Sequence, residues 1–248
     1  MAKQSGLGDN LYIDGNNVSG DVGSVDTIAA PQNLLDVTGI DKSAHERIGA
    51  LRDGEIKFTA FFNAATGQIH SVLKTLPTTD RFVTYNRGTV IGNPAASILA
   101  KQIGYDGKRG NDGSYTFDVD CQGNGYGLEW GNQLTAGFRT DTAATNGASY
   151  DFGAATSFGF QAYLHVNAFT GTDVTIKLQD SADNSSFTDI TSGAFTAVTG
   201  ATPLAQRIAV GGTATVRRYV RVVTATTGGF TSITFSVMLV KNTAAVTF

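Results

Sequence analysis

Apolar and polar residues alternate along several segments of the chain, most clearly in its C-terminal half. Strands are predicted at 158–166, 174–179 and 232–239, where every second residue is apolar. Turn-forming residues separate them at 181–186 and 226–229, because Gly, Asn and Asp tolerate the dihedral angles of tight reversals. Strands at this short spacing predict an Ig-like or jelly-roll β-sandwich, with no helix evident in this half.

The N-terminal half combines strand and helix patterns. Strands are predicted at 55–62, 81–86 and 114–122, and the glycine-rich stretch 104–113 is expected to form an extended hairpin loop. Apolar residues between Ile69 and Leu76 recur at helical spacing before Pro77, which predicts a helix over 66–76. A capping box at 43–46 predicts a second helix of a turn or two that Gly49 ends. We therefore expect a mainly β protein, with a barrel or sandwich domain and one flanking helix over 1–132 and the second sandwich over 133–248.

Composition and charge narrow the class of protein. Only 16% of the 248 residues are charged, and Cys121 is the single cysteine, so neither a disulfide framework nor a cysteine-based zinc cage is expected. Neither a signal peptide nor an apolar run of membrane-spanning length is present, which predicts a soluble protein made in the cytoplasm without a membrane partner. The sequence has no basic stripe with interleaved aromatic residues, so sequence-specific nucleic-acid binding is disfavoured.

Candidate chemistry is sparse. His45, His70 and His165 lie far apart and lack the spacing of a zinc site, and no metal or cofactor is expected. Asp118 and Asp120 lie side by side on one face of a predicted strand, but no histidine or metal motif accompanies them as acid–base catalysis would require. We expect a protein that is not an enzyme. The acidic residues of 180–189 miss the calcium-loop spacing and favour a polar hairpin.

One stretch, GIDKSAHERIGALRDGEIKFTAFF (39–62), gathers eight charged residues in a chain otherwise poor in charge. Its charges alternate in sign and its aromatic residues follow on a predicted strand. The stretch is therefore interpreted as an assembly surface, the alternative being a solvated helix turn and hairpin in a monomer.

Three runs of sequence together resemble the major tail (tail tube) proteins of long-tailed, siphovirus-type bacteriophages, particularly those of actinobacterial phages. They are DVTGIDKSAHERIGALRDGEIKFTAFFN, NPAASILAKQIGYDGKRGNDGSYTFDVDCQGNGYGLEWG and GTDVTIKLQDSADNSSFTDIT with the later RRYVRVVT. The resemblance implies a tail-tube-type β domain that closes with copies of itself into six-membered rings. These rings stack into a hollow tube for the DNA genome, and the C-terminal sandwich decorates its outside.

The resemblance also implies roles for residues and partners. It assigns contacts between subunits to Lys42, Glu46, Arg47, Arg52, Asp53, Glu55 and Lys57, a ring-stacking loop to Asp106, Lys108, Arg109 and Asp112, and an acidic strip facing the lumen to Asp118 and Asp120. Expected partners are further copies of the chain, the tape measure, terminator and tip proteins, and passing DNA that is not read, all within the virion. The alternative function is a phage surface or adhesion protein whose sandwich binds carbohydrate, with Tyr150, Phe152 and Tyr163 as stacking residues; a glycan hydrolase is a third possibility.

Overall fold

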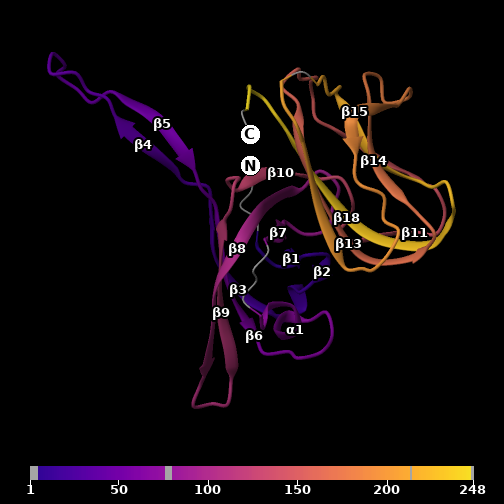
Figure 1. Cartoon of the computed structure of the whole chain (residues 1–248), viewed down its shortest axis with the longest axis horizontal. Helices are drawn as coiled ribbons and strands as arrows, with labels where there is room; N and C mark the ends of the chain where they lie inside the picture. The colour runs from indigo at the N-terminus through magenta and orange to yellow at the C-terminus, as the bar shows by residue number, and fades with distance from the viewer. Residues whose placement is uncertain (1–4, 76–79, 213, 247–248) are drawn as a thin grey trace.

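The fold is mainly β, as predicted, with two hairpins that project from the body (Figure 1). The structure, a computed structural model, describes residues 5–75, 80–212 and 214–246. Its strands are β1 (Asn10–Ile13), β2 (Asn16–Asn17), β3 (Val22–Ala29), β4 (Gln32–Asp36), β5 (Arg47–Arg52), β6 (Glu55–Phe61), β7 (Arg81–Asn86), β8 (Pro94–Arg109), β9 (Tyr115–Gly123), β10 (Glu129–Gln133), β11 (Arg139–Asp141), β12 (Asn146–Asp151), β13 (Phe160–Gly171), β14 (Thr175–Ser181), β15 (Thr188–Ala194), β16 (Leu204–Val210), β17 (Tyr219–Ala225) and β18 (Phe230–Lys241), with the α-helix α1 (Ile69–Leu73) and a 3-10 turn at Ser19–Asp21.

The N-terminal half forms a curved sheet with the pairing order β3-β6-β9-β8-β7-β1-β2. Its inner face holds an apolar core that includes Ile56, Phe58, Val83, Ile98 and Val119. On β6 and β9 buried and less buried residues alternate, so one face of each strand packs on this core and the other faces outward. The predicted strands at 55–62, 81–86 and 114–122 are confirmed to within one residue at either end.

The helix α1 lies against this core, inside the predicted range 66–76 but shorter. Ile69 and Leu73 are fully buried, and the Asp21 carboxylate accepts a hydrogen bond from the Ile69 backbone N–H at 3.0 Å. This side-chain acceptor satisfies one of the amides left unpaired at a helix start. Residues 66–68 form a turn instead of the expected first helical turn, and Leu76 and Pro77 lie outside the described residues.

The C-terminal half is a β-sandwich. The strands β16, β13 and β18 form one layer, and the sheet β12-β17-β14-β15 forms the other. Between them lies a core that includes Phe160, Leu164, Ile176, Val222 and Phe235. The three predicted strands of this half are present as β13, β14 and β18, longer than expected by three, one and four residues because cross-strand pairing extends past the alternating core positions.

Strand β10 joins the two halves, because it pairs with β8 on one side and with β18 on the other. Buried polar groups add to this junction: the Tyr163 hydroxyl donates a hydrogen bond to Glu129 at 2.5 Å, and the Arg207 guanidinium lies 3.1 Å from the same carboxylate. The predicted domain boundary between residues 132 and 133 falls inside β10. One sheet therefore continues across that boundary, although the two apolar cores lie on opposite sides of it.

Two local predictions are wrong. Residues 43–49 form no helix; they belong to the tip and returning strand of a long hairpin, because pairing of Asp36 with Arg47 and Leu35 with Ile48 competes with helix formation. The stretch 104–113 is not mainly a loop, since β8 continues to Arg109 and pairs with β9. Only the turn at 110–113 lies outside the strands.

Candidate assembly surfaces

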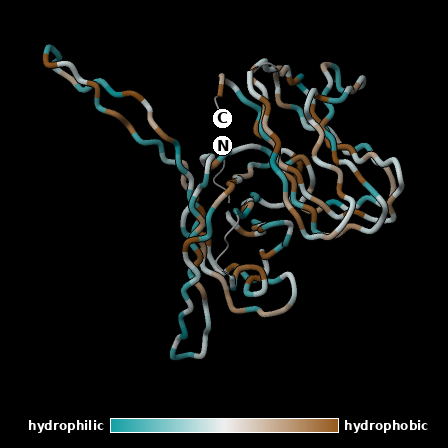
Figure 2. The backbone as a smooth tube through the Cα atoms, viewed as in Figure 1, coloured by the Kyte–Doolittle hydropathy of each residue, from teal (hydrophilic) through white to brown (hydrophobic). Residues whose placement is uncertain are grey.

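The hairpin of β4, β5 and their connecting turn (residues 32–52, called the arm) projects away from the body (Figure 1). Among the described residues the arm strands pair only with each other. Apolar residues occur along the arm, as the brown segments of Figure 2 show. Their side chains are exposed: Leu34 is 62%, Leu35 53%, Ile48 52% and Leu51 81% exposed, and Ile40 at the tip is fully exposed. Because successive residues of a strand point to opposite faces, Leu34 and Leu35 place apolar side chains on both faces of the arm. A two-stranded ribbon with apolar side chains on both faces is marginal in water, so this surface favours a partner.

The charged residues expected to contact other subunits separate into two groups. Four of them lie on the arm: Lys42 and Glu46 pair with each other at 3.7 Å, whereas Arg47 and Arg52 form no ion pair with any described residue. Both residues are exposed and therefore available to a partner.

The other three expected contact residues lie at or beyond the root of the arm. The Asp53 carboxylate accepts hydrogen bonds from the Gly54 N–H at 2.7 Å and from the Gln122 side chain at 3.1 Å. Lys57 lies 2.7 Å from Glu55 and 3.1 Å from Asp120. These groups are paired within the chain, so the structure does not bring all seven residues together.

The outward faces of β3, β6, β9 and the second half of β8 form a charged surface, called the polar face. The hydrogen bonds that Lys57 donates to Glu55 and to Asp120 raise the pKa of Lys57, and the hydrogen bond from Lys108 lowers the pKa of Asp118. The expected acidic strip is therefore a mixed surface that still holds more carboxylates than ammonium groups; its ionisable members are Asp26, Glu55, Lys57, Asp106, Lys108, Asp118 and Asp120.

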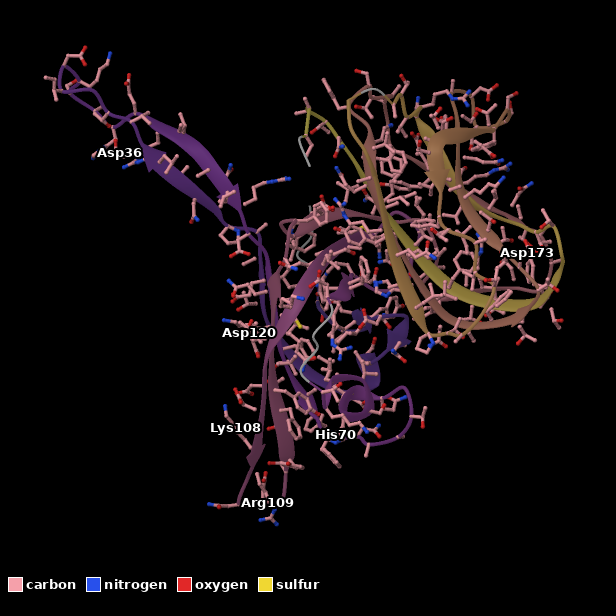
Figure 3. The ribbon with its side chains drawn as sticks, viewed as in Figure 1. Asp36, His70, Lys108, Arg109, Asp120 and Asp173 are labelled. Atoms are coloured by element: carbon pink, nitrogen blue, oxygen red, sulfur yellow. The ribbon has the colours of Figure 1, made fainter. Side chains whose placement is uncertain are left out.

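The hairpin of β8 and β9 points away from the body at the end opposite the arm (Figure 1). Arg109 lies near its tip and Lys108 beside it (Figure 3). The Asp112 carboxylate accepts hydrogen bonds from the Ser114 hydroxyl at 2.7 Å and its N–H at 3.0 Å, which lower the pKa of Asp112 and close the turn. Asp112 therefore stabilises its own turn, whereas Arg109 has no ion-pair partner among the described residues.

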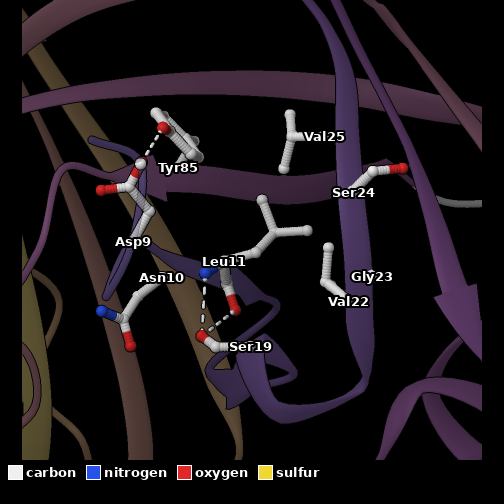
Figure 4. Close-up of a pocket in the computed structure, with 10 residues that line it drawn as sticks. Asp9, Asn10, Leu11, Ser19, Val22, Gly23, Ser24, Val25 and Tyr85 are labelled. Carbon is white, nitrogen blue, oxygen red and sulfur yellow. Dashed lines mark hydrogen bonds between the residues drawn. The ribbon is translucent and has the colours of Figure 1, made fainter. Parts of the chain in front are cut away.

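A cavity of about 260 Å³ lies between β1 and β3 (Figure 4). The two strands do not pair with each other, so the cavity marks an open seam in the curved sheet. The Asp9 carboxylate in its wall accepts hydrogen bonds from the Tyr85 hydroxyl and from Arg87 at 2.8 Å, and Ser19 bonds to Leu11. These polar groups satisfy one another, and the lining offers no set of groups for catalysis.

The histidines serve three separate local contacts. His45 lies 2.9 Å from Asp36 on the arm, and His70 lies 2.9 Å from the Tyr105 hydroxyl. His165 is buried between the halves, where its Nδ1 accepts from the Gly15 N–H at 3.1 Å and its Nε2 lies 2.8 Å from Thr84 Oγ1. Over residues 5–75, 80–212 and 214–246 no group of three metal-ligating side chains gathers, and no helix is long and apolar enough to cross a membrane.

The aromatic residues considered for carbohydrate binding do not form a sugar platform. Tyr163 is buried at the junction between the halves, and Tyr150 and Phe152 pack against the core of the sandwich. The acidic loop near 183 is a hydrogen-bonded turn: Asp183 accepts from the backbone N–H groups of Ser185 and Ser186, which lower its pKa. The prediction of a polar hairpin there is confirmed.

Sequence reasoning missed the apolar residues of the arm, which are its most exposed feature. The signal was present in QNLLDVTGI (32–40), where apolar residues occur without the period of a half-buried strand. Three aromatic side chains are exposed at the other end of β6 and β9, Phe61, Phe62 and Tyr115. Phe61 and Phe62 belong to the stretch 39–62 that was interpreted as an assembly surface, whereas the alternation of 114–122 placed Tyr115 on the core face.

Comparisons with known proteins give a structural likeness alone. No family model matches the sequence, and no curated protein matches it. The chain is similar to the Dit (gp 19.1) protein of phage SPP1, described as a paradigm of the hub adsorption apparatus in phages that infect Gram-positive bacteria, with 11% identity, a TM-score of 0.33 and coverage of 94% of this chain and 99% of that chain. It is also similar to a chain of the phage p2 baseplate in its activated conformation with Sr, with 11% identity, a TM-score of 0.30 and coverage of 94% of this chain and 98% of that chain. TM-scores of this size do not establish a common fold, and the role of this chain rests on its own residues.

Proposed function

We propose that this chain is a structural protein of a phage tail that assembles with further copies of itself. The observation that carries the proposal is the arm, whose two strands expose apolar side chains on both faces and pair with no other strand among the described residues. Covering such side chains is favourable by roughly 25 cal/mol per Å² of apolar surface removed from water. A second copy of the chain supplies that cover without any other partner.

The finer proposal is the tail tube: copies close into six-membered rings, and these rings stack into a tube through which the DNA genome passes. The sequence resemblance to tail tube proteins supports it, as does the polar face, whose excess of carboxylates repels phosphate instead of binding it. In this proposal the tape measure, terminator and tip proteins are further partners. The protein is made in the bacterial cytoplasm, ends up in the virion and carries out no catalytic step.

Negative-stain microscopy of the purified chain, together with sedimentation velocity, tests the proposal. Rings or tubes of uniform diameter are the expected result. Rings that do not stack would support self-assembly and refute the tube, and a monodisperse monomer at high concentration would refute both. A glycan array run on the same sample tests the carbohydrate-binding alternative, for which the structure offers no exposed aromatic platform at the three residues considered.

A further inference from the structure

Two Asn–Gly pairs occur in the chain, Asn124–Gly125 and Asn146–Gly147. In such a pair the backbone nitrogen of the glycine can attack the side-chain amide of the asparagine, because a glycine has no Cβ to hinder the approach. The attack requires rotation of the backbone between the two residues, so the fold decides which pair reacts. The structure places the two pairs in different environments.

The first pair lies in a turn that follows β9. Both of its residues are exposed, and Gly125 has a φ of 81° with open space where a side chain would be. The Gly125 N–H donates no hydrogen bond to any of the described residues. A groove of about 290 Å³ beside Gly125 and Tyr126 gives the turn room to rearrange. The attacking nitrogen of this pair is therefore accessible and unpaired.

The second pair is held in the sandwich. Asn146 begins β12 and pairs with Val223 of β17. The preceding residue, Thr145, exchanges hydrogen bonds of 2.9 and 3.0 Å with Thr224 of the same neighbouring strand, and Gly147 packs closely against the backbone of that strand. Rotation at this pair requires a local opening of the sheet, which costs free energy.

We propose that Asn124 is a site of spontaneous deamidation and that its product weakens the anchorage of the arm. The Gly125 nitrogen loses its proton to solvent base and bonds to Cγ of Asn124, while the bond from Cγ to Nδ2 breaks and Nδ2 leaves as ammonia with a proton from water. Water then adds to either carbonyl carbon of the succinimide ring and opens it to aspartate or isoaspartate. The reaction needs only this chain and water, so it is independent of the proposed function.

The new charge matters because the amide of Asn124 faces a carboxylate. Nδ2 of Asn124 donates to the two carboxylate oxygens of Asp80 at 2.9 and 3.0 Å. Hydrogen bonds from Lys101 first and then from Asn124 lower the pKa of Asp80, which is therefore ionised at neutral pH. Deamidation replaces the donor by a second carboxylate, so an attraction becomes a repulsion between like charges.

The same turn holds the root of the arm. The Gly123 N–H donates to the Gly54 carbonyl at 2.7 Å, and the Leu128 N–H donates to the Asp53 carbonyl at 3.4 Å. The two segments fit closely, since a Cβ on Gly54 would collide with Leu128. Isoaspartate inserts an extra methylene into the backbone between these two hydrogen bonds. The turn that spans them is then lengthened, which loosens the root of the arm.

Peptide mapping by mass spectrometry on aged wild-type chain tests the site. The folded chain is kept at mildly alkaline pH, where more of the glycine nitrogen is deprotonated, and replacement of NH₂ by OH is followed at both pairs. Asn124 should react at least about tenfold faster than Asn146, because Asn146 reacts only through local opening. In guanidinium chloride the two rates should converge. Equal rates in the folded chain, or a faster reaction at Asn146, would overturn the assignment.

Hydrogen exchange on the same samples tests the effect on the arm. Chain deamidated at Asn124 should exchange the amides of 53–54 and 123–128 faster than fresh chain, while the amides of β13 keep their rates. Asn124→Asp adds the charge without the longer backbone and should show a smaller increase. Asn124→Gln keeps an amide, and after ageing it should exchange like fresh wild-type chain. Unchanged exchange at 53–54 in the deamidated chain would overturn the loosening.

Discussion

The cross-strand pair Leu35 and Ile48 offers the sharpest test of the arm. The two residues lie opposite each other on β4 and β5, each about half exposed. Fully burying a Leu or Ile side chain stabilises by about 1.5–3 kcal/mol, so covering the exposed halves of both contributes about 1.5–3 kcal/mol to each contact between copies. At about 1.4 kcal/mol per tenfold change, replacing both by Asp should weaken each contact about 10-fold or more.

The same double variant should leave the monomer folded. Neither residue belongs to an apolar core, and a cross-strand pair contributes only about 0.2–1 kcal/mol, so urea unfolding should shift by about 1 kcal/mol at most. Sedimentation velocity over a concentration series measures the loss of assembly. Val90→Asp is the matched control, because Val90 is 60% exposed on the body and away from the arm. Assembly of the arm variant at the wild-type concentration would refute the role given to the arm.

Three further predictions concern charge and the junction between the halves. Reversing Arg47 and Arg52 to Glu should impair polymerisation with an unchanged circular dichroism spectrum, and unchanged tubes in the microscope would count against their interface role. Burial lowers the pKa of His165 to about 3. The contribution of the neutral ring to the free energy of unfolding is then fully present above the unfolded pKa of about 6.5 and falls as the pH decreases toward 3. Urea titrations should therefore show a loss of about 2 kcal/mol between pH 7 and pH 5. His165→Gln should remove that part of the pH dependence, and an unaltered slope would contradict the assignment. Glu129→Gln should destabilise by about 3 kcal/mol, because it leaves the buried Arg207 charge without its carboxylate; a loss below about 1 kcal/mol in the same titration would argue against a tightly coupled pair.

The sequence predicted those elements whose apolar periodicity agrees with their final pairing. The strand 55–62 matches β6 to within one residue, because its buried residues and those of its partner β9 follow the same alternation. The helix at 66–76 was found from the spacing of Ile69 and Leu73, yet its length was overestimated because residues 66–68 turn to bring Ile69 to the carboxylate of Asp21. That acceptor lies 48 positions earlier in the chain and leaves no local signal.

The sequence predicted the candidate surfaces less accurately than the strands, and the reason is physical. A capping box was inferred at Ser43, but the pairing of β4 with β5 outweighs a short helix that would bury nothing. Asp118 and Asp120 were correctly placed on an outward face, while the lysines that pair with them come from β6 and β8, whose register the sequence does not show. The apolar residues of the arm were overlooked because sequence patterns indicate which residues avoid water, not whether their cover belongs to the same chain.

Strand β10 has a mechanical consequence. Its hydrogen bonds to β8 and β18 continue one sheet from the N-terminal half into the sandwich. The cluster of Glu129, Tyr163 and Arg207 joins the two halves at the same junction. A torque applied to the sandwich is therefore transmitted into the sheet of the other half instead of being absorbed by a hinge. A fluorophore fixed on the sandwich turn at 182–186 should thus report the rotation of the whole molecule, which polarised fluorescence can follow.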